Sequence, residues 1–342
     1  MTAREISDVQ RPTVVLTNRV FPEVIAFLDG FARVVSNPSV EPFSRAQFVA
    51  KASDASALMV FMNDSLDART LDHCPKLRIV AAALKGCDNF DVAACTARGI
   101  WFTIVPDLLT IPTAELAIAL ALGLSRKVVE GDQVVRSGKF AGWRPELYGT
   151  GLSGRTAGIV GMGQLGRALA RRLRAFGMEI LYADPVALPR AVEQELGASH
   201  MDLAGVFAGS DFVFSLLPLS AKTTHLIDAS LLAGMKSGGF LINVGRGSVV
   251  DEQAIAGALA SGKLGGYAAD VFEMEDWNRA GRPSFVHPAL LAQAGKTLFT
   301  PHLGSAVADV RLEIEMRAAR NIAEALGGHR PPDAINNPRG TS

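Results

Sequence analysis

The chain reads Gly158-Ile-Val-Gly161-Met-Gly163-Gln-Leu-Gly166 near its middle, where an apolar run stops at three spaced glycines. Residues with helical spacing of apolar side chains follow, up to about Phe176. In such a segment the strand turns sharply at Gly161, a ligand approaches the backbone at Gly163, and the helix packs closely at Gly166. A Cβ would be obstructive at each of these points. This order of strand, glycine turn and helix predicts a dinucleotide pyrophosphate bound at a helix N-terminus.

A second apolar run, residues 178–183, ends in Asp184, eighteen residues past Gly166. A carboxylate at this distance accepts a hydrogen bond from a ribose 2′-hydroxyl and repels a 2′-phosphate. We therefore expect NAD as the cofactor, with NADP as a less favoured alternative because Arg190 lies nearby in the sequence. The simpler interpretation is a βαβ unit that turns on glycines and binds nothing.

The composition is that of a globular protein with two domains. The 342 residues are 49% hydrophobic, which is enough for a large core. Thirty-four basic side chains balance thirty-four acidic ones, so no global charge attracts nucleic acid or an anionic membrane. We expect a small-molecule ligand instead, recognised by local charge.

The cysteines and the chain start point to a reducing compartment. Cys74, Cys87 and Cys95 fit no metal-ligand or redox spacing, so we expect neither a metal site nor structural disulfides. The first twelve residues mix charged and polar side chains and do not resemble a signal peptide. The longest apolar stretch, residues 114–124, contains a glutamate and is too short for a bilayer. A cytoplasmic location is the expectation.

Short apolar runs alternate with helical patterns along the whole chain, which predicts an α/β fold with two doubly wound parallel-sheet domains. We expect a first domain over residues 1–109, completed by the last helix and tail at 306–342, and a dinucleotide-binding domain over residues 110–305. A single long helix is expected from Pro112 to about Arg136. The expected strands lie at 13–17, 57–62, 79–84, 100–104, 156–160, 178–183, 211–217, 239–244, 265–270 and 297–300.

Polar residues follow three of the later strands, at the sheet edge where ligands bind. Arg246 lies between Gly245 and Gly247, which are expected to leave its backbone free to turn and its guanidinium free to reach an anion with paired donors. Carboxylates follow the strand that ends near Asp270, and His302 follows a proline at the next strand end. Taken singly, each residue could be a surface charge or a structural histidine. Together they suit a hydride transfer, which needs a base such as a histidine oriented by a carboxylate.

These residues are similar to those of the D-2-hydroxyacid dehydrogenase superfamily. The resemblance covers nearly the whole chain in order, through the glycine loop, Leu217-Pro218-Leu219 with Thr223, Gly-Arg246-Gly, Asp270-Val-Phe-x-x-Glu275 and Pro301-His302. It implies a flavodoxin-like substrate domain and a Rossmann NAD-binding domain. It also implies that Arg246 binds the substrate anion, that His302 is the acid or base and that Glu275 orients it. The implied cofactor contacts are Thr113, Gly161, Gly163, Gln164, Leu165, Gly166, Asp184, Pro218, Thr223 and Asp270.

Within the superfamily, the chain resembles the phosphite (phosphonate) dehydrogenases. Two departures from the usual hydroxyacid pattern carry this resemblance. Lys85 replaces an apolar residue in Leu84-Lys85-Gly86-Cys87-Asp88-Asn89, and Glu275 is followed by Asp276-Trp277 where the superfamily has proline. Residues 105–110, 142–151 and 304–307 match as well. Met62, Trp143 and Tyr148 correspond to residues that shape or cover the phosphite site, although each could equally be plain core.

Phosphite is largely a dianion near neutral pH, so one arginine leaves much of its charge uncompensated. A second cation at about 4 Å adds up to roughly 4 kcal/mol at an effective dielectric constant near 20, before desolvation. Lys85, beside Gly86, is the candidate for this cation, and Arg311, nine residues past His302, could supply a third. The simpler interpretations are a solvated loop lysine and a surface helix arginine.

The expected activity is oxidation of phosphite to phosphate with reduction of NAD. In this reaction water attacks phosphorus, His302 removes the proton of that water, and Arg246 and Lys85 orient the anion. One alternative is a D-2-hydroxyacid dehydrogenase that acts on a small carboxylate. Another is a non-catalytic corepressor that senses NAD, a role of some superfamily members. The resemblance also implies a homodimer.

Overall fold

The computed structural model describes residues 11–338 and divides into two compact units. Unit 1 takes the chain up to Leu109 and from Val307 onward, and unit 2 comprises Thr110–Ala306. The sequence placed Ala306 with the last helix, and this was wrong by one residue. The backbone N–H of Ala306 donates to the carbonyl of Leu303 at 2.8 Å, which closes a turn within unit 2 before the helix begins.

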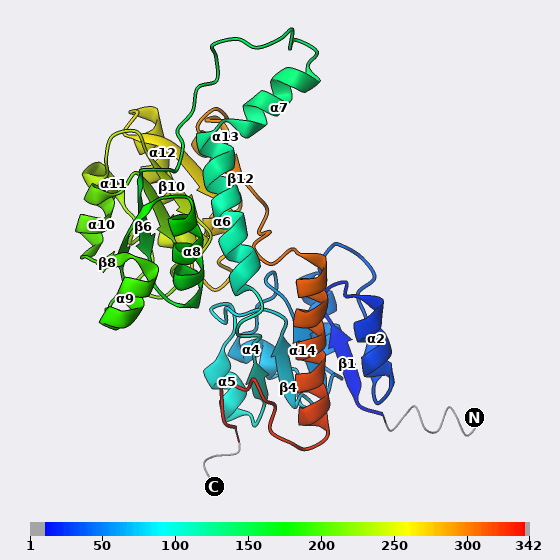
Figure 1. The fold of residues 1–342 in the computed structure, drawn as a ribbon. Helices are drawn as coiled ribbons and strands as arrows, with labels where there is room; N and C mark the ends of the chain where they lie inside the picture. The colour runs from blue at the N-terminus through cyan, green and yellow to red at the C-terminus, as the bar shows by residue number, and fades with distance from the viewer. Residues whose placement is uncertain (1–10, 339–342) are drawn as a thin grey trace. The chain divides into compact units, whose positions relative to one another are not determined.

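Unit 1 is built on a five-stranded parallel sheet with the order β2-β1-β3-β4-β5, which is the flavodoxin order. Its strands are β1 (Thr13–Leu16), β2 (Arg33–Val35), β3 (Ala57–Val60), β4 (Ile79–Ala82) and β5 (Trp101–Thr103). Its helices are α2 (Pro22–Asp29), α3 (Arg45–Ala52), α4 (Ala68–Leu71), α5 (Val92–Ala97) and α14 (Ala308–Leu326). Figure 1 shows α2 and α14 packed beside this sheet.

Apart from β2, the strands of unit 1 are buried on both faces. Along β3, Ala57 and Met59 belong to one hydrophobic cluster, whereas Leu58 and Val60 belong to another. Successive strand side chains point to opposite faces, so each cluster fills the space between the sheet and the helices on one side. Ile314 and Ile322 of α14 lie in the cluster that contains Met59. The last helix therefore completes the core that the N-terminal part of the chain begins.

Unit 2 is built on a seven-stranded parallel sheet with the order β12-β11-β10-β9-β6-β7-β8. Its strands are β6 (Thr156–Val160), β7 (Glu179–Ala183), β8 (Ala198–His200), β9 (Phe212–Ser215), β10 (Gly239–Asn243), β11 (Leu264–Ala269) and β12 (Thr297–Phe299). Its α-helices are α6 (Thr110–Ser125), α7 (Val128–Arg136), α8 (Gln164–Ala175), α9 (Arg190–Leu196), α10 (Leu203–Gly209), α11 (Ala229–Gly234), α12 (Glu252–Ala260) and α13 (Pro288–Leu291). Two 3-10 turns, η1 (Gly247–Val249) and η2 (Glu273–Glu275), complete it.

This order is that of a Rossmann domain with one additional strand, and the strand order reverses between β6 and β9. The prediction of two doubly wound parallel-sheet domains is confirmed. Two short strands, β2 and β8, were not expected from the sequence. Each is a three-residue strand at the edge of its sheet and is partly exposed, so neither produces an apolar run.

The single long helix expected after Pro112 is wrong, because the structure breaks it into α6 and α7. Lys127 separates the two helices with a left-handed backbone, φ 54° and ψ 41°. This conformation turns the chain, and Figure 1 shows α7 extending away from the sheet of unit 2. No residue of α7 is buried. Over the described residues, none of the helices combines the length and apolarity needed to cross a membrane.

Candidate active site

The glycine loop follows β6 and leads directly into α8, as the sequence predicted. Gly161 has a φ of +99°, which favours glycine, and a Cβ on Gly166 would lie 2.3 Å from the carbonyl oxygen of Gly161. Gly163 differs, because a Cβ there would meet no protein atom within 4 Å. Gly161 and Gly166 are thus required by the turn and its packing. Gly163 leaves open space at the start of a twelve-residue helix, as the backbone approach of a pyrophosphate requires.

Asp184 follows β7 and lies against the glycine loop. Its Oδ2 accepts the backbone N–H of Met162 at 2.8 Å, and its Oδ1 accepts that of Val186 at 3.1 Å. A carboxylate has about four acceptor positions, so these two bonds leave capacity for a ribose hydroxyl. The open space at Gly163, the helix N-terminus and this carboxylate therefore fit a dinucleotide. The prediction that Asp184 selects NAD over NADP stays a prediction.

Four further predicted cofactor residues, Gln164, Leu165, Pro218 and Thr223, follow β6 and β9, between which the strand order reverses. Gln164 and Leu165 are the first residues of α8. Thr223 closes the loop after β9, because its hydroxyl donates to the carbonyl of Pro218 at 2.7 Å. A Cβ on Gly161 would lie 3.2 Å from the side chain of Leu217, so this loop packs on the glycine loop. Ligands of open α/β sheets bind at this kind of position.

Arg246 lies in a tightly packed turn after β10, and the prediction that its flanking glycines leave the backbone free was wrong. A Cβ on Gly245 would lie 2.7 Å from the carbonyl oxygen of Leu217, and one on Gly247 would lie 1.9 Å from the carbonyl carbon of Phe272. Both glycines are required by close contact between backbone segments. Arg246 is half-buried, and its Nη1 donates to the carbonyl of Gly245 at 2.9 Å.

Asn243, a residue not singled out from the sequence, supports this turn from the end of β10. Its side-chain nitrogen donates to the carbonyl of Arg246 at 3.0 Å, and its side-chain oxygen accepts the N–H of Gly245 at 3.2 Å. The side chain is fully buried. An asparagine that ends an apolar strand just before Gly-Arg-Gly was the available sequence signal.

His302 and Glu275 are in direct contact. His302 Nδ1 lies 2.6 Å from Glu275 Oε2, and Glu275 Oε1 accepts the backbone N–H of Phe272 at 2.8 Å. Since the carboxylate accepts a hydrogen bond from Nδ1, Nε2 is the ring nitrogen that can exchange a proton with a substrate. About a quarter of each side chain is exposed. The sequence expected a histidine oriented by this glutamate, and the structure has that geometry.

Asp270, predicted to contact the cofactor, holds the turn that carries His302. It is 1% exposed and accepts the Thr300 hydroxyl at 2.6 Å and the N–H groups of Leu303 and Gly304 at 2.6 and 2.8 Å. Burial raises the pKa of its carboxyl group above the usual range. Thr113, also predicted to contact the cofactor, donates to the carbonyl of Gly304 at 3.1 Å. Cofactor binding by these two residues stays a prediction.

In unit 1, the predicted substrate residues lie near the carboxyl ends of β3 and β4. Met62 follows β3, and exposed Lys85 and half-buried Gly86 follow β4. Asn89 joins the two loops, since its side chain donates to the carbonyl of Met62 at 3.2 Å. Arg311 of α14 donates to the carbonyl of Ala83 at 3.2 Å, just before Lys85 in the chain.

Arg311 is less suited to compensating a substrate charge than the sequence suggested. Its Nη2 donates to Glu315 Oε1 at 3.1 Å, and its guanidinium lies 5.7 Å from the ring centre of Phe61. Glu315 is buried, and that burial raises the pKa of its carboxyl group. The ion pair offsets part of the arginine charge before any ligand arrives. Its role as a third cation stays a prediction.

Trp143 and Tyr148 lie on the segment after α7 and are 81% and 72% exposed. They are therefore not part of a core, and nothing within the described chain covers them. Whether they shape the substrate site stays a prediction.

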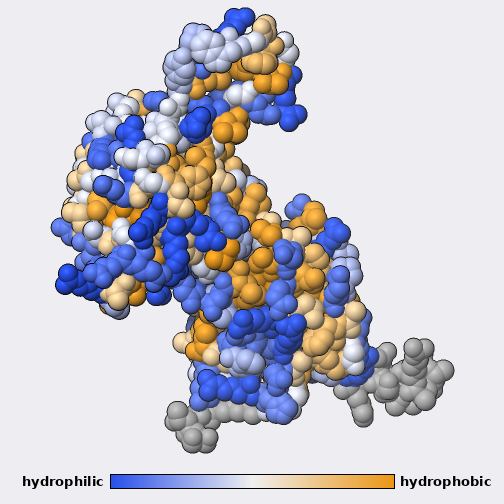
Figure 2. Space-filling model, in the orientation of Figure 1, coloured by the Kyte–Doolittle hydropathy of each residue, from blue (hydrophilic) through white to orange (hydrophobic). Residues whose placement is uncertain are grey.

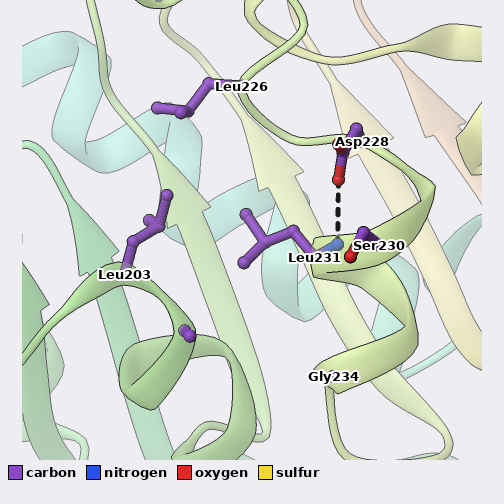
Figure 3. Close-up of a pocket in the computed structure, with 7 residues that line it drawn as sticks. Leu203, Leu226, Asp228, Ser230, Leu231 and Gly234 are labelled. Carbon is purple, nitrogen blue, oxygen red and sulfur yellow. Dashed lines mark hydrogen bonds between the residues drawn. The ribbon is translucent and has the colours of Figure 1, made fainter.

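Two other features of the structure contribute no functional groups. A hollow of about 320 Å³ lies beside α10 and α11 (Figure 3), and three of its seven lining residues are leucines. Its one carboxylate, Asp228, accepts the N–H of Leu231 as the cap of α11. Among residues 11–338, no group of three or more His, Cys, Asp or Glu side chains is arranged to hold a metal ion.

Comparison with known proteins identifies the class of this site. The family model described as "D-isomer specific 2-hydroxyacid dehydrogenase, NAD binding domain" matches residues 118–304. The glyoxylate reductase of Thermococcus litoralis is 35% identical over 95% of this chain and 97% of its own length. That of Aeropyrum pernix is 38% identical over 96% of each chain.

Solved structures agree with this assignment. A protein of Thermus thermophilus superposes with a TM-score of 0.85 at 31% identity, covering 95% of this chain and all of that one. The NADPH-dependent glyoxylate/hydroxypyruvate reductase of Sinorhizobium meliloti, in complex with NADP and malonate, has a TM-score of 0.81 at 31% identity, over 95% of this chain and 97% of its own. The expectation of a nicotinamide dinucleotide cofactor is confirmed.

We predict that Gly163→Ala weakens cofactor binding without destabilising the protein. The added Cβ meets no protein atom, but it occupies the space through which a pyrophosphate approaches the backbone. The dissociation constant of NADH, measured by fluorescence titration, should rise about tenfold or more, while the melting temperature stays unchanged. Gly257→Ala on α12, which also adds a Cβ in open space, is the control and should leave NADH affinity unaltered. Equal affinities for the two variants would contradict the assignment of the pyrophosphate site.

Proposed function

The chain belongs to the D-isomer specific 2-hydroxyacid dehydrogenase family, and we propose that it transfers a hydride between a nicotinamide cofactor and a small 2-hydroxy or 2-oxo carboxylate. The observation that carries this proposal is the 2.6 Å contact between His302 Nδ1 and Glu275 Oε2, at the same sheet edge as the Arg246 turn. The names of the relatives, glyoxylate reductases, favour glyoxylate as the first substrate to test.

The proposed mechanism assigns one task to each of three side chains. When bound, the nicotinamide supplies or accepts the hydride. Arg246 binds the carboxylate through paired N–H donors, which fixes the orientation of the neighbouring carbon. His302 Nε2 gives a proton to the carbonyl oxygen during reduction and removes it from the hydroxyl during oxidation. Glu275 holds the imidazole in the tautomer that this task requires and stabilises its protonated form.

Phosphite is the second candidate substrate. The sequence placed it first, whereas the names of the compared relatives favour a carboxylate. What supports it is exposed Lys85 after β4, where the superfamily pattern has an apolar residue. An additional cation suits a dianion better than a monoanion. In this reaction water attacks phosphorus, the P–H hydride passes to NAD, and His302 takes a proton from the water, so that phosphate and NADH are formed.

Steady-state assays of glyoxylate with NADH and of phosphite with NAD should separate the two candidates. We expect glyoxylate to give the higher kcat/KM, and detectable phosphite oxidation if Lys85 binds a dianion. In that case Lys85→Met should raise the KM for phosphite about tenfold or more and change the KM for glyoxylate less, because a monoanion needs less compensation. Lys76→Met, which removes an exposed lysine paired with Asp54, is the control. A phosphite kcat/KM far above that of every carboxylate would reverse the order of the candidates.

We predict that His302→Ala lowers kcat about 10²- to 10⁴-fold on the substrate that the protein turns over, the usual contribution of a general acid or base. Glu275→Gln should have a smaller effect, because an amide oxygen can still accept the Nδ1 proton. NADH titrations should give dissociation constants within about twofold of the original protein. NADH binding without turnover of any acid or of phosphite would support the corepressor alternative instead.

We also propose that the protein forms a homodimer through α7 and the segment 137–151. Large side chains on this part of unit 2 are exposed, and Figure 2 shows apolar surface on it. Exposed apolar patches of this kind mark protein interfaces. The residues concerned are Val128, Val129, Val135, Phe140, Trp143, Leu147 and Tyr148.

Light scattering coupled to size-exclusion chromatography tests the dimer. The unaltered chain should elute with twice the mass of one chain, about 72 kDa, since one chain is 36.2 kDa. A double variant, Val128→Glu and Val135→Glu, should shift it toward the monomer because two desolvated carboxylates disfavour the interface. Val186→Glu, at an exposed valine outside α7, should leave the mass unchanged. A monomeric unaltered protein would rule out the proposal.

A further inference from the structure

The turn that carries Arg246 and the turn that carries Glu275 pack against each other backbone to backbone. Arg246 directly precedes η1, and Glu275 is the last residue of η2. Gly247 lies so close to η2 that a Cβ on it would be 1.9 Å from the carbonyl carbon of Phe272 and 2.3 Å from the nitrogen of Glu273. A displacement of one turn is therefore transmitted to the other.

Asp276, the residue after Glu275, joins the two turns. Its Oδ2 accepts the backbone N–H of Ser248, the second residue of η1, at 2.7 Å. Asp276 is only 2% exposed. A carboxylate at such a depth is costly unless donors satisfy it, so this hydrogen bond connects two groups that water does not reach. The family pattern has proline at this position, and a proline side chain cannot accept a hydrogen bond.

Arg279 holds the same serine from its other side. The chain turns back at Asp276, whose carbonyl accepts the N–H of Arg279 at 2.9 Å. Arg279 Nη1 then donates to the Ser248 hydroxyl at 3.3 Å. The same guanidinium pairs with Glu273 of η2, whose side chain is 10% exposed. Ser248 is thus held at its backbone nitrogen by Asp276 and at its hydroxyl by Arg279.

Glu273 connects η2, with Arg279, to helix α12 of unit 2. Its Oε1 accepts the N–H of Glu252 at 3.1 Å, and Glu252 Oε1 accepts the N–H of Glu273 at 3.0 Å. This reciprocal pair fixes η2 to the start of α12, which follows η1 in the chain. The elements around Arg246 and Glu275 therefore share one buried polar network rather than two independent loops.

We propose that Asp276 and Arg279 are positioning residues for Arg246. By holding Ser248, they fix η1 against η2 and so keep the guanidinium of Arg246 at the position that the reaction with His302 requires. The inference rests on the proposed function, in which Arg246 binds the substrate anion. Neither residue touches the reacting atoms. Their effect arises because a misplacement of about 1 Å between a binding group and a catalytic group can cost on the order of 100-fold in rate.

The test compares Asp276→Ala with Asp276→Asn by steady-state kinetics on the anion that the unaltered protein turns over. Asp276→Ala removes the acceptor of the Ser248 N–H and should raise the KM for the anion about tenfold, with a smaller change in kcat and an unchanged dissociation constant for NADH. Asp276→Asn keeps an acceptor oxygen at the same place and should stay within about threefold of the original KM. Rescue by asparagine separates positioning by this hydrogen bond from an effect of charge.

Asp228→Ala is the matched control, because it removes a carboxylate that also accepts a backbone N–H in unit 2 but caps α11 instead. It should lower the melting temperature and leave the KM unchanged. If Asp276→Ala does not fold, Arg279→Gln carries the test: it leaves Asp276 in place, weakens the hold on the Ser248 hydroxyl, and should raise the KM about threefold or more.

Three results would overturn the inference: a lower melting temperature for Asp276→Ala with an unchanged KM, equal losses in the alanine and asparagine variants, or an unchanged KM for Arg279→Gln. If neither phosphite nor any small 2-hydroxy or 2-oxo carboxylate is turned over, the proposed function fails separately. Calorimetric titration of the NADH complex with oxalate, a small planar dianion, then replaces KM as the readout. Oxalate affinity should fall in Asp276→Ala and persist in Asp276→Asn. Failure of the unaltered protein to bind oxalate would also overturn the inference, because it requires Arg246 to bind an anion.

Discussion

The site in unit 2 depends on short buried polar side chains. These side chains form hydrogen bonds with the backbone of the turns that follow the parallel strands. Asp270 follows β11 and accepts three hydrogen bonds from the segment 300–304, where His302 adopts a left-handed backbone with φ 59°. Asn243 ends β10 and supports the Arg246 turn in the same manner. A parallel sheet brings all its carboxyl ends to one edge, so two such supports suffice to direct two functional side chains into the same region.

This arrangement explains why the histidine backbone is held in a conformation that non-glycine residues seldom adopt. A left-handed residue costs roughly 1 to 3 kcal/mol and persists only where the surroundings determine it. The N–H of His302 donates to the carbonyl of Asp270 at 2.9 Å, while the Asp270 carboxylate holds the following residues. The imidazole is thereby turned toward Glu275. The left-handed backbone of His302 and its contact with Glu275 thus both follow from the hydrogen bonds that Asp270 makes to this turn.

The sequence predicted the features that depend on periodicity and on residue type. Alternating apolar runs predicted both sheets, and the order of Arg246, Glu275 and His302 predicted which side chains would gather at the sheet edge. Contacts between backbone segments that are distant in the chain could not be predicted from the sequence. Gly247 was expected to supply flexibility, but it permits the approach of Phe272, which is twenty-five residues away in the chain. The sequence around Lys127 continues an apolar helical pattern. It therefore gives no indication that Lys127 adopts a left-handed backbone between α6 and α7. Asp276 was noticed only as a departure from proline, and its partner, Ser248, belongs to a different turn.

The charge around Arg311 bears on which anion the protein prefers. The sequence predicted three cations for the substrate anion, Arg246, Lys85 and Arg311, and three cations would suit a dianion. Arg311, however, is bound to buried Glu315, whose Oε2 also accepts the backbone N–H of Phe21 at 3.1 Å. Because this carboxylate lies 3.1 Å from the guanidinium, it offsets part of the arginine charge for any anion farther away. Arg311 also donates to the carbonyl of Ala83 at 3.2 Å, so the same side chain joins α14 to the segment that leads into the loop after β4. Under the proposed function, we therefore expect any preference for a dianion over a monoanion to depend mainly on Lys85, in the loop that follows β4.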